Sequence, residues 1–134
     1  MKSSALAVPS SPERLAEVER FVRDGALEAG FSEDKTYDIL LAVSEAATNA
    51  LKHGNKYDPA KSATVTIYDH PDKFVVSVLD EGEGFDPDET PDPTAPENLL
   101  RDSGRGLYLM RVYADNLEYR TEERGVEAIL TFKK

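Results

Sequence analysis

The sequence contains no cysteine, and it has only two histidines among its 134 residues. The absence of cysteine excludes disulfides, thiolate nucleophiles and cysteine-based zinc sites. The two histidines lie far apart in the chain, at positions 53 and 70, which does not favour a zinc site of any other kind. The chemistry of this chain is therefore not expected to depend on thiols or on zinc.

Long hydrophobic runs and excess positive charge are also missing. The longest internal apolar run covers residues 39–43, whereas a bilayer-spanning helix needs about 20 apolar residues. The first residues, MKSSALAVPSSP, contain one lysine and a four-residue apolar run cut by Pro9, too short for a signal peptide. The formal net charge is −10, from 16 basic and 26 acidic residues, which disfavours binding to nucleic acid or anionic lipid. We expect a cytoplasmic protein whose partners are proteins or a small ligand that brings its own cation.

The order of predicted elements indicates an α+β fold in one domain, residues 1–134. A short edge strand is predicted over 5–8, and a capping-box pattern of Ser10 and Glu13 predicts a helix that begins there and ends at Gly30. A second helix follows, and the later elements are strands at 63–69 and 73–80, a proline-rich loop at 86–103, a helix at 106–114 and a hairpin over 117–134. This order predicts a two-layer sandwich with a mostly antiparallel sheet and the helices on one face.

The second helix, predicted over 33–53 with Ser32 as its N-cap, carries an unusual polar stripe. Glu45, Asn49 and His53 recur at intervals of four residues, which places them along one flank of an α-helix beside small alanines. A carboxylate next to an amide oxygen suits a hard cation such as Mg²⁺. A solvated helix face explains the same pattern, so the helix alone does not decide between a site and a surface.

Two glycine pairs provide further candidate positions. Asp80 ends a predicted strand in line with core residues, and Gly82 and Gly84 follow where the backbone must bend or approach a ligand closely. Gly104 and Gly106 precede a predicted helix, whose free N–H groups favour an anion. A plain turn and a flexible helix entry explain these pairs equally well. Neither pair fits the dinucleotide-binding motif, and the P-loop motif is absent.

The three signals, taken in order, resemble a known family. EAATNALKHG is similar to the N box, DEGEGF to the G1 box and SGRGL to the G2 box of the GHKL ATPases, the Bergerat-fold superfamily. Within it, the run AVSEAATNALKHGNKYDP resembles the bacterial anti-sigma-factor serine-protein kinases. The resemblance spans about residues 5 to 133, and it depends on the three boxes together rather than on any one.

The resemblance implies a role for each matching residue. Glu45 would be the catalytic base, Asn49 would hold the Mg²⁺ that bridges the ATP phosphates, and Asp80 would accept a hydrogen bond from the adenine amine. Residues 86–103 would form the ATP lid. The remaining implied nucleotide-binding residues are His53 near the nucleotide, Gly82 and Gly84 against the base, and Gly104, Arg105, Gly106 and Leu107 of the G2 box around the phosphates.

Two features depart from the family pattern. The lid segment carries six acidic residues against the single Arg101, although an acidic lid should repel an anionic nucleotide. Family members usually have threonines after the glycine of the last hairpin, where this chain has Val126 and Glu127. The resemblance implies that one of those threonines contacts adenine, so this chain lacks that hydroxyl, although Asp80 would still specify adenine.

The resemblance implies an ATP- and Mg²⁺-dependent serine-protein kinase that acts as an anti-sigma factor. Its substrate would be an anti-sigma-factor antagonist, its other partner a sigma factor, and a homodimer is possible. The alternative is a nucleotide-gated switch of the same fold that binds a partner without catalysis, although such a switch needs no base at Glu45. The catalytic domain of a sensor histidine kinase is disfavoured, since no helix pair in the sequence would carry a phosphoacceptor.

Overall fold

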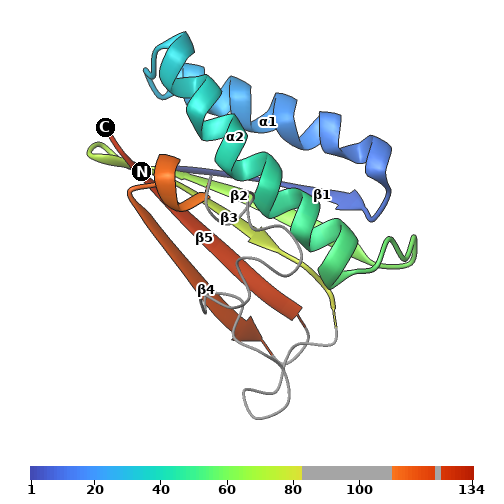
Figure 1. Cartoon of the computed structure of the whole chain (residues 1–134). Helices are drawn as coiled ribbons and strands as arrows, with labels where there is room; N and C mark the ends of the chain where they lie inside the picture. Colours follow the sequence, from blue (N-terminus) through green and yellow to red (C-terminus); the bar gives the residue numbers. More distant parts are fainter. Residues whose placement is uncertain (83–109, 123–124) are drawn as a thin grey trace.

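The computed structural model describes residues 1–82, 110–122 and 125–134, which form a two-layer α+β sandwich. One layer is a five-stranded antiparallel sheet with the strand order β1-β2-β3-β5-β4. The helices lie together on one face of this sheet (Figure 1). The predicted fold class is therefore confirmed. The strands are β1 (Lys2–Pro9), β2 (Ser62–Asp69), β3 (Lys73–Leu79), β4 (Asn116–Glu122) and β5 (Gly125–Lys133).

Two long helices form the second layer. A 3₁₀ turn, η1 (Pro12–Arg14), leads into α1 (Leu15–Glu28), and α2 (Glu33–Asn49) continues into the π-helical turn η2 (Ala50–Gly54). The Ser32 hydroxyl accepts a hydrogen bond from the backbone N–H of Lys35 at 3.1 Å, which confirms the predicted N-cap. Gly30, with φ at +100°, supplies the left-handed residue that ends α1.

The predicted capping box at Ser10 is wrong. Helical structure begins at Pro12, after Ser11, whose side chain makes no capping hydrogen bond. The Ser10 hydroxyl is buried and donates instead to the carbonyl of Lys61 at 2.8 Å. The Ser10 side chain therefore makes a tertiary hydrogen bond in place of the helix cap that the local pattern predicted.

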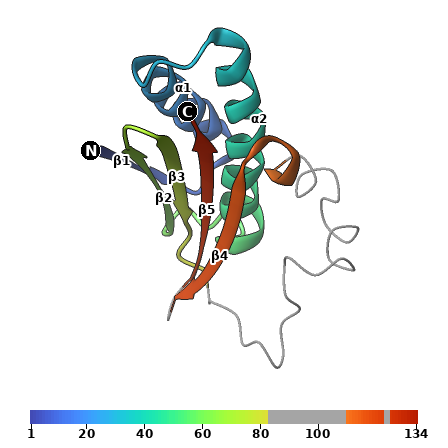
Figure 2. The ribbon, with the colours of Figure 1, turned by 90° about the vertical axis from the view of Figure 1, so that its left-hand side faces the viewer.

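The core lies between the helices and one face of the sheet, as the edge-on view in Figure 2 shows. Alternate residues of β3, Phe74, Val76 and Val78, are buried, and each sits opposite a β5 residue of the same face. α1 contributes Val18, Val22 and Ala26 at helical spacing. These residues form the apolar faces of α1 and β3, and the next residue in line after β3 is Asp80, as its predicted alignment with core residues requires.

The C-terminal part matches the expected hairpin. Strands β4 and β5 pair from Asn116 opposite Thr131 to Glu122 opposite Gly125. Residues 110–113 are helical, and the Tyr119 hydroxyl on β4 donates to Met110 Sδ at 3.9 Å. The predicted loop at 86–103 and the first residues of the helix predicted over 106–114 lie outside the described residues.

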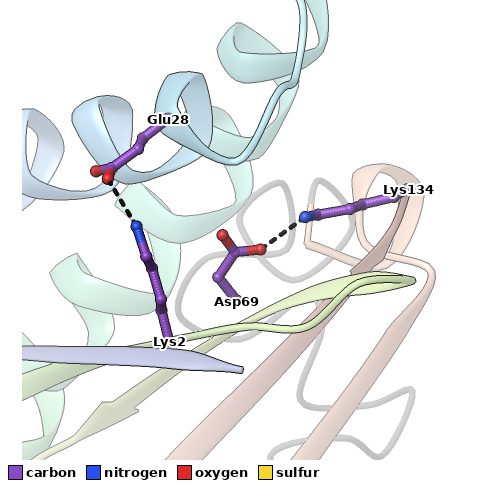
Figure 3. Close-up of polar contacts among 4 residues, drawn as sticks. All are labelled: Lys2, Glu28, Asp69 and Lys134. Carbon is purple, nitrogen blue, oxygen red and sulfur yellow. Dashed lines mark hydrogen bonds and ion pairs between the residues drawn. The ribbon is translucent and has the colours of Figure 1, made fainter.

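Two ion pairs link the ends of strands to neighbouring elements (Figure 3). Lys2 of β1 reaches Glu28 of α1 at 3.3 Å, and Lys134, after β5, reaches Asp69 of β2 at 2.7 Å. The first pair is highly exposed and adds little to stability, whereas the second is largely shielded from solvent. Both lie at the sheet end away from Asp80.

Candidate functional site

Asp80 is a buried carboxylate at the end of β3. Its side chain is 6% exposed, and its Oδ1 atom accepts hydrogen bonds from the backbone N–H groups of Gly82 and Val126, each at 3.0 Å. The Asp80 N–H in turn donates to the Val126 carbonyl at 3.1 Å. The Asp80 carboxylate therefore accepts the Val126 N–H in place of a backbone carbonyl, at the point where the pairing of β3 and β5 ends. Its second oxygen, Oδ2, makes no hydrogen bond to the described residues, so it is the atom available to a ligand.

Three glycines allow the backbone to close around this carboxylate. A Cβ atom at Gly54 would lie 2.1 Å from Asp80 Oδ2, and one at Gly125 would lie 2.0 Å from the Asp80 carbonyl oxygen. A Cβ atom at Gly82 would lie 2.4 Å from the Gly54 carbonyl oxygen. Real side chains never approach so closely, so each position requires glycine. Gly82 therefore packs against the end of the π-helical turn.

Burial raises the pKa of the Asp80 carboxyl above its ordinary value of 3.8, although the N–H donors of Gly82 and Val126 and the charge of Lys61 oppose that rise. A carboxylate in this position is costly to ionise and is only partly compensated by the protein. A ligand with an N–H donor for Oδ2 would supply the missing compensation.

This pKa shift predicts how Asp80→Asn changes stability with pH in the absence of ligand. The raised pKa means that the penalty of the buried charge is absent below 3.8 and grows as the pH rises through the folded-state pKa. The parent should therefore lose stability relative to Asp80→Asn as the pH rises toward neutrality. Melting temperatures of both proteins across this range would measure the difference. A difference that is independent of pH would contradict the assignment of a raised pKa.

Glu45 and Asn49 lie one turn apart on the last part of α2, which packs on β3 and β5. Both side chains are half-buried, and neither makes a hydrogen bond or an ion pair with the described residues. Asn55 and Ser10, which are buried more deeply, are hydrogen-bonded to each other. Glu45 and Asn49 could therefore contact a ligand.

The helix changes its winding after Asn49, so the turn that carries His53 is not a regular α-helical turn. The Asn55 N–H bonds the Ala50 carbonyl at 2.9 Å, a π-helical turn with one residue more than an α-turn. His53 is exposed on this turn. The wider turn carries Gly54 to Asp80, so the end of the helix bearing Glu45 and Asn49 lies against the end of β3 (Figure 1).

The alanines beside the polar stripe do not leave open space. Ala42 and Ala46 are 0% and 3% exposed and belong to the hydrophobic core. Their small side chains allow close packing of α2 in the core.

The remaining predicted site residues lie outside the described residues. They are Gly84 of the second box, the lid at 86–103, and Gly104, Arg105, Gly106 and Leu107. The structure therefore brings Asp80 and Gly82 to the helix end that follows Glu45 and Asn49.

The positions where threonines were expected have defined partners. Val126 binds Asp80 through its backbone N–H and carbonyl, while Glu127 points to the opposite side of β5. There the Glu127 carboxylate accepts a hydrogen bond from the buried Ser77 hydroxyl at 2.5 Å. Backbone groups thus hold Asp80 from β5, and no hydroxyl at 126 or 127 adds to them.

Sequence reasoning missed Gly54, Asn55 and Gly125 as parts of this site. The first two read as a helix stop and the third as a hairpin turn. The only sequence signal for Gly54 and Asn55 was their position directly after the polar stripe, and Gly125 had no such signal.

A metal at this site would have few protein ligands. Among the described residues, no group of three or more His, Cys, Asp or Glu side chains could hold a metal ion. Mg²⁺ commonly uses one or two protein oxygens together with waters and substrate phosphates, so a single amide such as Asn49 fits that pattern.

No helix within the described residues is long and apolar enough to span a membrane.

Residues 8–132 match the family described as the histidine kinase-like ATPase domain. The chain belongs to this family. The description as an ATPase domain agrees with the expected use of ATP.

Curated relatives narrow the assignment. Serine-protein kinase RsbW of Bacillus subtilis (strain 168) is 32% identical over 143 residues, which cover 98% of this chain and 88% of the relative. The RsbW kinase of Listeria innocua is 31% identical over 132 residues, with coverage of 94% and 83%. These relatives place the chain among the RsbW-type serine-protein kinases of the histidine kinase-like ATPase family. The expected family and enzyme class are confirmed.

Solved structures support the fold. The structure of the RsbU and RsbW domains of Rv1364c from Mycobacterium tuberculosis matches with a TM-score of 0.68 at 19% identity. The match covers 98% of this chain, which spans 32% of that chain. The histidine kinase domain of Erythrobacter litoralis EL346 matches with a TM-score of 0.59 at 17% identity, over 93% of this chain and 61% of that one.

Proposed function

We propose that this RsbW-type kinase transfers the γ-phosphoryl group of MgATP to a serine of an anti-sigma-factor antagonist, and that it sequesters a sigma factor. The observation that carries the proposal is the buried Asp80 carboxylate, whose Oδ2 atom has no partner among the described residues. It lies against the end of the helix that presents Glu45 and Asn49. The names of the RsbW relatives support the serine substrate, and the family resemblance suggests the antagonist and the sigma factor.

Each residue has one task in this proposal. Asp80 Oδ2 accepts a hydrogen bond from the adenine amine, which partly compensates the buried charge. Asn49 would hold Mg²⁺ through its amide oxygen, and the ion would supply electrostatic stabilisation of the transferred group. Glu45 accepts the proton of the attacking serine hydroxyl while the γ-phosphoryl group moves to the serine oxygen.

The further parts of the site extend this arrangement. Gly84 and the G2-box residues Gly104, Arg105, Gly106 and Leu107 would contact the base and the phosphates, with the lid at 86–103 above them. His53 would lie near the nucleotide. The whole of residues 1–134 would act as one cytoplasmic ATP-binding domain.

The direct test is phosphoryl transfer. We expect the protein, incubated with γ-labelled ATP, Mg²⁺ and an antagonist protein encoded nearby, to place label on a serine of that antagonist. Omission of Mg²⁺ should abolish the label. If no label is transferred, while MgATP still changes the affinity for a protein partner, the noncatalytic switch is the correct function.

A further inference from the structure

A fully buried asparagine connects the turn that carries Asp80, after β3, to the end of the helix that carries Glu45 and Asn49. Asn55 is 0% exposed and follows directly on the π-helical turn η2. Its Nδ2 group donates to the Ser10 hydroxyl at 2.7 Å and to the Ser62 carbonyl at 3.0 Å. Its Oδ1 atom accepts from the Glu81 N–H at 2.7 Å. The Asn55 side chain thus links the end of the π-helical turn to the segments that follow β1 and β3 and to the start of β2.

These partners fix the orientation of the amide. Ser10 already donates its hydroxyl proton to the Lys61 carbonyl, so it can only accept from Asn55. The Glu81 N–H can only donate, so Oδ1 must face it. Aspartate would place acceptors against Ser10 and Ser62, and a hydrophobic residue would satisfy none of these groups. Asparagine supplies two donors and one acceptor here without a buried charge.

The Glu81 N–H belongs to the peptide that joins Asp80 to Glu81. On its other side, Asp80 is held by Val126 of β5. Asn55 therefore holds the Asp80 turn from the helix side while β5 holds it from the sheet side. The Asn55 backbone N–H also closes the π-helical turn on Ala50, so the same residue sets where the end of α2 lies.

We infer that Asn55 is a positioning residue of the nucleotide site. Through Glu81 it fixes the Asp80 carboxylate relative to the helix that carries Glu45 and Asn49. The inference rests on the proposed function, because it assigns Asp80 to adenine. A misplacement of about 1 Å at a binding group can cost a large factor in activity, so a rigid link between the two halves is needed.

Asn55→Ala tests this inference, with Ser10→Ala as its matched control. Ser10→Ala removes hydrogen bonds at the far side of Asn55 but leaves the bond from Glu81 to Oδ1 intact. Both variants should melt at lower temperature than the parent, because both lose buried hydrogen bonds. Only Asn55→Ala should weaken nucleotide binding, by about tenfold, which corresponds to one lost hydrogen bond at the site. The measurement is the Kd for ATP, ADP and AMP by calorimetry, at a temperature where all proteins are folded.

The pattern across nucleotides separates positioning from general destabilisation. Because the defect lies at the adenine end, the factor should be similar for ATP, ADP and AMP, and the Mg²⁺ dependence of ATP binding should not change. If Asn55→Ala does not fold, Asn55→Ser provides the same comparison, since its shorter side chain falls short of Glu81. The inference is wrong if the folded variant binds ADP as tightly as the parent, or if Ser10→Ala loses as much affinity. If the parent itself binds no adenine nucleotide, the proposed function fails as well.

Discussion

Glu45→Gln should slow phosphoryl transfer to serine by about 10²–10⁴-fold, the usual contribution of general-base assistance. Glutamine keeps the size of the side chain and can still accept a hydrogen bond, but it cannot take up the proton of the attacking hydroxyl. MgATP binding should survive, because Asn49 and Asp80 are unchanged. Single-turnover transfer of label to the antagonist, followed beside the Kd for MgATP, measures the two effects separately.

Two other variants of α2 serve as controls for this result. Glu33→Gln removes an exposed carboxylate from the first turn of the same helix and should transfer phosphate at the parent rate. Asn49→Ala should weaken binding of MgATP while metal-free nucleotide is bound nearly as before. Transfer by Glu45→Gln at the parent rate would show that Glu45 is a solvated helix residue and would remove the assigned base.

The second large effect concerns the choice of base. ATP should bind at least about 100-fold more tightly than GTP, because a hydrogen bond to a charged acceptor is worth about 1.5–3 kcal/mol and guanine replaces it with repulsion. Adenine presents an amine donor where guanine presents a carbonyl acceptor. With GTP, the Asp80 carboxylate would face a second acceptor in a buried position. The Kd values of both nucleotides with Mg²⁺ measure this preference.

Asp80→Asn is the matched variant for that measurement. Its amide can turn an NH₂ group toward the base, so it should lose most of its affinity for ATP and much of its preference over GTP. The fold should remain, since an amide oxygen can still accept from Gly82 and Val126. Equal binding of ATP and GTP by the parent would contradict the assignment of Asp80 to adenine.

The fold was predictable wherever local patterns and tertiary packing agree. The alternation in β3 is confirmed because the same residues serve the strand and the core. The cap at Ser32 is confirmed because this exposed side chain bonds locally, to the N–H of Lys35. Ser10 was assigned wrongly because a capping box is a local pattern, and a buried tertiary network outweighed it. The change to π-helical winding after Asn49 has no periodic signal in the sequence, so it could not be predicted.

The site was only partly predictable for a similar reason. The buried position of Asp80 followed from its alternation with Val76 and Val78. Gly54, Asn55 and Gly125 could not be assigned to it, because their role depends on the packing of segments distant in sequence. Each is required by a contact to Asp80 or its neighbour, and no spacing along the chain encodes such a contact.

The most direct test of this account is a structure of the protein with Mg²⁺ and a non-hydrolysable ATP analogue. The account predicts the adenine amine within hydrogen-bond distance of Asp80 Oδ2, Mg²⁺ on the Asn49 amide oxygen and the Glu45 carboxylate facing the γ-phosphate. A nucleotide bound away from Asp80, or a metal held without Asn49, would contradict it.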